Sequence, residues 1–90
     1  MTTLYVRHPV SDYAVWRRAF DDHAPTRERY GITVLRVQHA VGNPLEIIIT
    51  LEARDLALAR EFVDSDELRM AMMRAGVASR PEIWWAEEIT

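Results

Sequence analysis

The chain contains no cysteine, and this absence excludes several kinds of chemistry. Disulfide bonds, thiolate nucleophiles and cysteine-ligated zinc sites cannot form without it. The apolar runs are short, and none approaches the roughly 20 residues that a transmembrane helix needs. Residues 1–7 lead directly into a strand-like pattern and lack the apolar core of a signal peptide. We therefore expect a cytoplasmic protein with no membrane partner.

Blocks of like charge are also absent. The 11 basic and 14 acidic residues give a net charge of −3 and are interspersed along the chain. Without a basic stripe to neutralise phosphates, we expect no nucleic-acid partner. Glycine-rich phosphate loops and nucleophile elbows are missing, and the three histidines lack the spacing of a metal motif. The sequence therefore predicts no metal site and no nucleotide cofactor.

What the chain does have is a large apolar share for its size. Its 90 residues are expected to form a single domain, 1–90, with a modest core. Yet 49% of the residues are hydrophobic, including three Trp, three Tyr and two Phe. This share is generous for a small monomer, and it indicates that some apolar surface faces a partner chain.

Apolar periodicity predicts strands and helices in the order βαββαβ. Ser11 or Asp12 provides the first helix N-cap, and Asp64 and Ser65 restart a cap. Gly31 suits the left-handed position that follows a helix, and the last helical run ends at Gly76. The predicted elements, in order, are a strand at 4–8, helices between 12 and 30 interrupted at Pro25, strands at 32–41 and 45–51 joined by a turn, helices at 53–64 and from 65 to 75, and a strand at 82–89.

This order predicts an α+β fold of ferredoxin-like topology, with a four-stranded antiparallel sheet and helices on one face only. The other face is expected to be apolar in places. Strict alternation puts Ile32 and Val34 on one side of strand 32–41, and Leu35 and Val37 on the other. A second copy of the sheet is the simplest cover for such a face, so we predict a homodimer.

Two histidines meet at one end of this predicted sheet. His8 and His39 each end one of two parallel strands, with the third strand antiparallel between them. Because imidazole titrates near neutral pH, both are candidate catalytic residues that could move a proton. The alternative is that each ring is merely solvated or bonded to a nearby carbonyl.

Four aromatic residues are expected at the same end. Tyr13 and Trp16 lie on the first helix, and Trp84 and Trp85 begin the last strand, where adjacent residues must point in opposite directions. They are candidate substrate-binding residues that form an aromatic wall. The alternatives are that Tyr13 and Trp16 are ordinary core residues, and that one of the two strand tryptophans packs in the dimer interface.

Two further polar residues have weaker signals. Arg36 lies in mid-strand and must either pair with an acid or bind a carboxylate of a ligand, so it is a further candidate substrate-binding residue. His23 falls near Pro25, on the polar side of its helix, and we expect it at the surface.

The chain resembles the dimeric α/β-barrel superfamily over nearly its whole length. It is similar to small bacterial proteins described as cyclase-like or as related to antibiotic-biosynthesis monooxygenases. The residues that carry the resemblance are Asp12, Tyr13, Trp16, Arg17, Phe20, Asp21, Arg27, Gly31 and Ile32, then Asn43 and Pro44, then Ala59, Phe62, Ser65, Leu68, Arg69, Met72, Ala75, Gly76, Val77 and Pro81.

The resemblance implies a homodimer whose two sheets pack into a barrel, with a pocket between sheet and helices in each subunit. Relatives include cofactor-independent monooxygenases, cyclases of aromatic polyketides and haem-degrading enzymes. The haem-degrading branch relies on an Asn, a Trp and a His, whereas the single Asn of this chain, Asn43, falls in the predicted hairpin turn.

Three interpretations are therefore open. The first is an enzyme, a cofactor-independent monooxygenase or cyclase, that acts on an aromatic or polyketide-like small molecule through His8 or His39. The second is a non-catalytic dimer that binds a small ligand or serves as an accessory protein. The third is a scaffold in which Trp16 is sealed in a packed core. A cavity of about 300 Å³ or more beside these residues would favour a small-molecule site.

Overall fold

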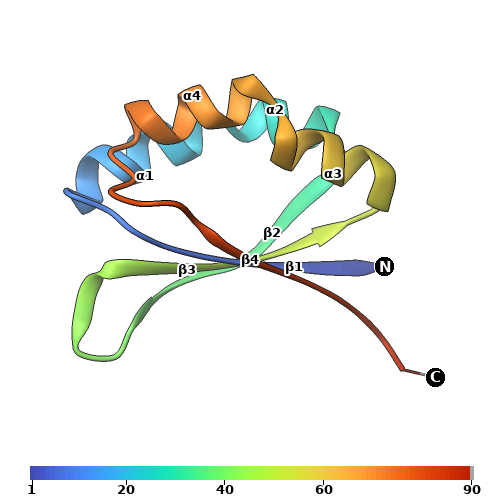
Figure 1. Cartoon of the computed structure of the whole chain (residues 1–90), viewed down its shortest axis with the longest axis horizontal. Helices are drawn as coiled ribbons and strands as arrows, with labels where there is room; N and C mark the ends of the chain where they lie inside the picture. Colours follow the sequence, from blue (N-terminus) through green and yellow to red (C-terminus); the bar gives the residue numbers. More distant parts are fainter. Residues whose placement is uncertain (90) are drawn as a thin grey trace.

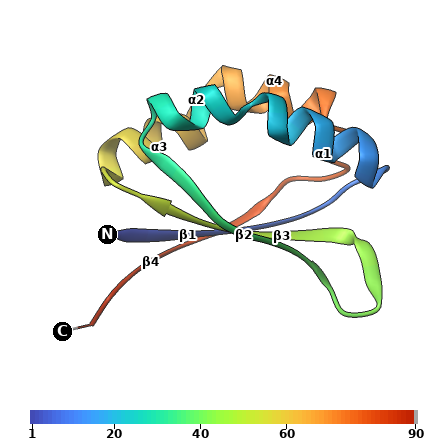
Figure 2. The same ribbon diagram turned by 180° about the vertical axis from the view of Figure 1, so that it is seen from behind.

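The strands form one antiparallel sheet, and every described helix lies on the same face of it (Figures 1 and 2). The computed structural model describes residues 1–89. The strand order is β2-β3-β1-β4, so the predicted ferredoxin-like topology is confirmed. The elements are β1 (Thr2–Pro9), α1 (Tyr13–Asp22), α2 (Ala24–Arg29), β2 (Ile32–Ala40), β3 (Asn43–Ala53), α3 (Leu56–Asp64), α4 (Asp66–Arg74) and β4 (Glu82–Glu87).

Side-chain caps set where the helices begin. The Asp12 carboxylate accepts a hydrogen bond from the third residue of α1, and the Ser65 hydroxyl does the same for α4, as predicted. The expected start of α3 at residue 53 was wrong. Ala53 instead ends β3, where it pairs with Thr2, and Asp55 caps the helix. The Asp55 acceptor satisfies an amide of the first turn, so the helix begins after it.

The left-handed glycines close the helices as expected. Gly31 has φ +70 and Gly76 has φ +74. Gly76 also ties the end of α4 to the start of α1, because its carbonyl accepts a 3.0 Å hydrogen bond from the backbone N–H of Ser11. A Cβ at position 76 would lie 2.7 Å from the Ser11 hydroxyl oxygen. This junction closes the fold at the end of β1.

A β-bulge in β2 overturns the alternation expected for that strand. The register passes from Val34 to Arg36, and Leu35 is left as the extra residue. Strict alternation would turn Val37 to the uncovered face. After the bulge it pairs with Ile49 and packs against the core instead. The uncovered face of β2 is therefore less apolar than its sequence indicates.

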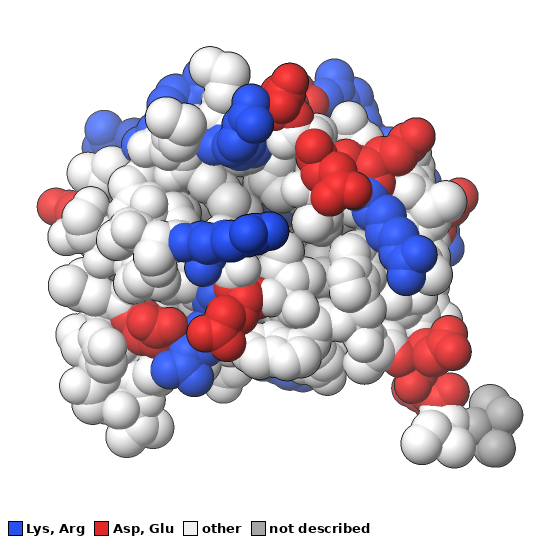
Figure 3. Space-filling view, in the orientation of Figure 1, with Lys and Arg blue, Asp and Glu red and all other residues white. Residues whose placement is uncertain are grey.

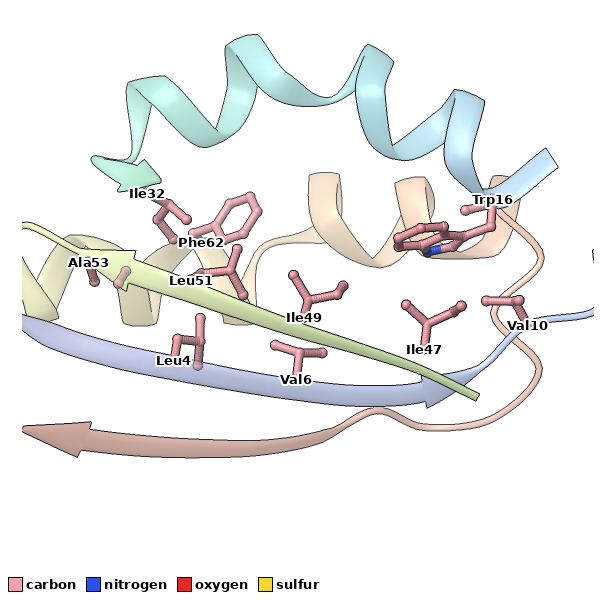
Figure 4. Packing of buried hydrophobic residues seen from close by; sticks show 12 residues of the cluster. Leu4, Val6, Val10, Trp16, Ile32, Ile47, Ile49, Leu51, Ala53 and Phe62 are labelled. Carbon is pink, nitrogen blue, oxygen red and sulfur yellow. The ribbon is translucent and has the colours of Figure 1, made fainter. Parts of the chain in front are cut away.

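The core lies between the sheet and the helices (Figure 4). Alternate residues of β3, from 47 to 53, face the helices together with their partners on β1. Each such apolar side chain, fully buried, stabilises the fold by about 1.5–3 kcal/mol. The buried set is Leu4, Val6, Val10, Trp16, Ile32, Ile47, Ile49, Leu51, Ala53, Ala59, Phe62 and Ala75.

Within residues 1–89, no segment covers the face of the sheet away from the helices. Tyr5 and Trp84 are cross-strand partners there, both partly exposed, and Ile48 on β3 shares the face. The accessible surface is 6074 Å², whereas a monomer of this mass typically exposes about 5,400 Å². The hairpin between β2 and β3 and the end of β4 both bend away from the helical layer (Figure 1). The excess surface follows from this open, curved sheet.

Charges of both signs are interspersed over the helical layer and along the sheet, as expected (Figure 3). None of the helices in residues 1–89 combines the length and apolarity needed to cross a membrane.

Candidate functional site

A cavity of about 80 Å³ lies between the helical layer and β1 and β3. Its polar lining residues are His8, His23 and Arg27. All other lining residues are apolar: Leu4, Val6, Trp16, Ala19, Phe20, Ile49, Leu51, Phe62, Val63, Leu68, Ala71, Met72, Ala75, Val77 and Ile83. The cavity is smaller than the roughly 300–1,000 Å³ typical of ligand pockets. It is therefore small for a ligand pocket.

His8 stands at the cavity wall where β1 ends. Its side chain is buried, and its ring centroid lies 6.0 Å from that of Trp16 in an edge-on arrangement. The Nδ1 atom is buried and has no hydrogen-bond partner among residues 1–89. Burial lowers the pKa of His8 from the usual 6.5, so the ring is neutral at pH 7. A neutral imidazole whose Nδ1 has no partner within residues 1–89 can accept or donate a proton within an apolar wall.

Two aromatic rings of α1 form the adjoining wall. Trp16 and Phe20 are one helical turn apart, and their rings stack with centroids 4.8 Å apart and planes 22° apart. The centre of the Tyr13 ring lies 5.9 Å from that of Trp16, but Tyr13 is 46% exposed and does not line the cavity. Of the two aromatic residues predicted on this helix, only Trp16 therefore faces the site.

Arg27 is a buried cation at the same cavity. Its side chain is 8% exposed, and its Nη1 donates a 2.8 Å hydrogen bond to the carbonyl oxygen of Phe20. The guanidinium carbon lies 4.0 Å from the centre of the Phe20 ring, which is a cation–π distance. Among the described residues, Arg27 forms no salt bridge with a carboxylate. Burial lowers its pKa, but a guanidinium stays charged.

His23 also faces the cavity. Its ring centroid lies 6.0 Å from that of Phe62, and its buried Nε2 has no hydrogen-bond partner within residues 1–89. Burial lowers the pKa of His23, and the nearby Arg27 charge lowers it further. The prediction that His23 lies at the surface was therefore wrong.

A signal for this placement was present in the sequence. Trp16, Phe20, His23 and Arg27 follow one another at spacings of four, three and four, the pattern of one helical face. Pro25 does not interrupt that face, because it lies in the first turn of α2, where proline is tolerated. The two short helices together therefore turn all four side chains towards the sheet.

The second predicted histidine lies at the expected end of the sheet but outside the cavity. His39 and His8 pair with the same residue, Ile47, from opposite sides. The His39 side chain is exposed, however, and its Nδ1 is 3.0 Å from the Ala40 carbonyl oxygen. Arg36 is exposed on the uncovered face and forms no salt bridge among the described residues.

The two strand tryptophans point to opposite faces, as predicted, and neither lines the cavity. Trp84 pairs with Tyr5 on the uncovered face. Trp85 pairs with Leu4 on the helical face, where it packs against the core with the Arg60 guanidinium 5.9 Å from its ring. Because they pair with Tyr5 and Leu4 of β1, both tryptophans lie away from the His8 end of the strands.

The site is thus an apolar cavity, set in a ferredoxin-like fold, where one buried ring nitrogen of His8 and one of His23 have no hydrogen-bond partner and Arg27 has no salt bridge among residues 1–89. No group of three His, Asp or Glu residues within residues 1–89 is placed to hold a metal ion. At about 80 Å³ the cavity falls short of the roughly 300 Å³ that would favour a small-molecule site, and Trp16 is 2% exposed within the core cluster, as expected for a packed core.

Comparison with solved structures finds this fold in several proteins. A candidate antibiotic biosynthesis monooxygenase from Bordetella bronchiseptica matches with a TM-score of 0.80 at 10% identity, over 99% of this chain and 97% of that chain. A second such candidate, from Caulobacter crescentus, matches with a TM-score of 0.73 at 14% identity, over 99% and 90%. A conserved protein from Methanosarcina mazei matches with a TM-score of 0.73 at 13% identity, over 98% and 92%.

At these identities the likeness shows the fold alone. The ferredoxin-like fold that the sequence resemblance implied is confirmed by these neighbours, several of which are described as antibiotic biosynthesis monooxygenases. No protein-family model matches the sequence, and no curated protein matches it either.

Proposed function

We propose that the protein is a homodimeric, cofactor-independent monooxygenase that acts on a small, single-ring phenol or enol in the cavity of each subunit. The observation that carries this proposal is the buried, unpartnered Nδ1 of His8 at the cavity wall beside Trp16. The monooxygenase descriptions of the neighbouring structures favour this class of reaction. The cavity volume of about 80 Å³, below the usual range of ligand pockets, limits the ligand to a single small ring at most.

In this mechanism His8 is the general base. Because burial keeps its pKa low, the neutral ring accepts the proton of the phenol or enol and leaves an electron-rich anion against the Trp16 wall. That anion donates electrons to O₂, and the apolar walls keep water from the reacting carbon. The para carbon bonds one oxygen of O₂, and the resulting peroxide takes the proton back from His8. Loss of the para hydrogen as the O–O bond breaks then gives a quinone and one water, so no external reductant is required.

Oxygen uptake tests the catalytic proposal. Purified protein is mixed with monocyclic phenols, resorcinol and 3-hydroxybenzoate among them, in an oxygen electrode, and we expect saturable uptake. His8→Gln should lower kcat by about 10²–10⁴-fold, the usual contribution of a positioned base. His39→Gln is the matched control, because His39 is exposed and outside the cavity. Equal rates for His8→Gln and the unmodified protein would overturn the role of His8.

A second candidate function is ligand binding without catalysis. A catalytic histidine is commonly oriented by a hydrogen-bond partner on its second ring nitrogen. Within residues 1–89, His8 Nδ1 has no such partner, and this favours binding without catalysis. In this case the same phenols would bind saturably, as followed by the fluorescence of the three tryptophans, without any oxygen uptake. Saturable binding with no uptake by any phenol would therefore replace the enzyme proposal with this one.

The homodimer rests on the uncovered sheet face. Tyr5, Ile48 and Trp84 give that face an apolar centre, and Leu35 is 47% exposed on the neighbouring bulge. The surface exceeds the typical monomer value by about 600 Å². A standard interface buries about 800 Å² on each partner. Packing two such faces together would cover this apolar centre.

Sedimentation analysis tests the dimer. We expect a mass of about 21 kDa, twice the 10.5 kDa chain. Trp84→Glu should convert the protein to monomers, because it places a charge at the centre of the proposed interface. Met73→Glu is the control, since Met73 is 74% exposed on the helical layer. A monomer in the unmodified protein at micromolar concentration would contradict the proposal.

A further inference from the structure

The unpaired guanidinium at the cavity indicates which phenols the site takes. We propose that Arg27 and His23 form an anion-binding subsite, so that the ligand is a phenolic acid whose carboxylate binds there. This inference rests on the function proposed above and specifies the ligand class of the same cavity.

Arg27 has unused hydrogen-bonding capacity in a place where water is scarce. A guanidinium carries five N–H donors, and the hydrogen bond from Nη1 to the Phe20 carbonyl oxygen is the one found for it among residues 1–89. Contact with the Phe20 ring stabilises the cation but leaves other donors free. Asp21 attracts the Arg27 cation at longer range, but no carboxylate among residues 1–89 lies within salt-bridge distance of it. A buried charge without a close ionic partner is costly, and a planar carboxylate matches the donor pattern of arginine. A ligand carboxylate would supply the missing partner.

His23 adds a second polar atom to the same subsite. It lies one helical turn before Arg27, and its Nε2 is buried and unpartnered within the described chain. Both side chains line the one cavity. With its proton on Nε2, His23 donates a hydrogen bond to an anion held by Arg27. One anion therefore satisfies two groups that the protein leaves incomplete.

The subsite also orients the ligand. The centre of the Phe20 ring lies 4.0 Å from the guanidinium carbon of Arg27 and 4.8 Å from the centre of the Trp16 ring. The centres of the Trp16 and His8 rings are 6.0 Å apart. The aromatic stack thus lies between the anion-binding end and the His8 end. A monocyclic acid with its carboxylate at Arg27 has its ring along this stack and its hydroxyl towards His8.

A pair of isosteric probes tests the inference without any variant. We expect 3-hydroxybenzoate to bind at least tenfold more tightly than the neutral 3-hydroxybenzamide, as measured by calorimetry at pH 7. Equal affinities would overturn the anion-binding subsite and leave the proposed function standing. Binding of neither probe would overturn the proposed small-molecule site, and the subsite with it. The two failures are therefore distinguishable.

Substitutions then assign the preference to its residue. Arg27→Met should reduce the ratio of the two dissociation constants to near one while changing that of the amide by less than about twofold. Arg18→Met is the matched control, because Arg18 is exposed on α1 and outside the cavity. If Arg27→Met does not fold, Arg27→Lys keeps the charge but loses the planar donors, and the ratio should fall severalfold. A ratio unchanged in the folded Arg27 variant would show that Arg27 only braces Phe20.

Discussion

Filling the cavity provides a direct test of its size. Ala71 lines the cavity from α4, and Ala71→Leu adds three carbon atoms, about 2.4 kcal/mol of burial at 0.8 kcal/mol each. Removing an 80 Å³ void is worth about 1.9 kcal/mol at roughly 24 cal/mol per Å³. The two estimates describe the same gain. After about 0.5–1 kcal/mol for lost leucine rotamers, we expect the free energy of unfolding to rise by about 1–2 kcal/mol.

Urea denaturation followed by tryptophan fluorescence measures this change. Ala57→Leu is the matched control, because Ala57 is exposed on α3 and its leucine should change stability by less than about 0.5 kcal/mol. Ala71→Leu should also abolish binding of 3-hydroxybenzoate, since its side chain occupies the ligand space. A loss of stability in Ala71→Leu, with the control neutral, would refute the reasoning, because it would show that the site has no room for three carbon atoms.

Two further predictions concern pH and the Gly76 junction. Burial lowers the pKa values of His8 and His23 below 6.5, so at lower pH the unfolded chain binds protons that the folded chain does not. The free energy of unfolding, measured by urea titration, should therefore fall as the pH is lowered from about 7 to 5. His8→Gln should make this fall smaller. A free energy of unfolding that rises towards pH 5 would contradict the burial of both rings. Gly76→Ala should cost about 1–2 kcal/mol for its left-handed backbone, plus the displacement of the Ser11 hydroxyl 2.7 Å from the new Cβ. Gly42→Ala is the control, because a Cβ there would have no atom within 4 Å and the variant should show the backbone cost alone. If thermal denaturation shows the same loss of stability for both variants, the Ser11 side chain moves aside at no cost.

Local signals explain why most of the fold could be predicted. The caps at Asp12 and Ser65 and the left-handed Gly31 and Gly76 act within one helical turn, so their effect does not depend on the rest of the chain. The order of strands and helices then left few possible topologies. That topology also brought His8 and His39 to the same end of the sheet.

The candidate site was only partly predictable. His8 and Trp16 could be placed together, because one ends a strand and the other begins the helix that crosses back over it. His23 was misplaced, although its spacing from Phe20 and Arg27 carried the signal. We expected Pro25 to interrupt the helix and His23 to lie on its polar side, whereas α2 continues the face that points to the sheet after a short break.

The sequence by itself determined the order of the elements, their caps and the predominantly apolar character of the layer between sheet and helices, because these follow from local backbone preferences and periodicity. Only the tertiary structure decided which way Val37, Trp84 and His39 face. A single bulged residue reverses the facing of every residue after it, and the register between two strands is chosen by packing over their whole length. Neither the position of the bulge nor the strand register is encoded in any short stretch of sequence. The cavity and its unpartnered polar groups therefore form only when the helices pack on the sheet.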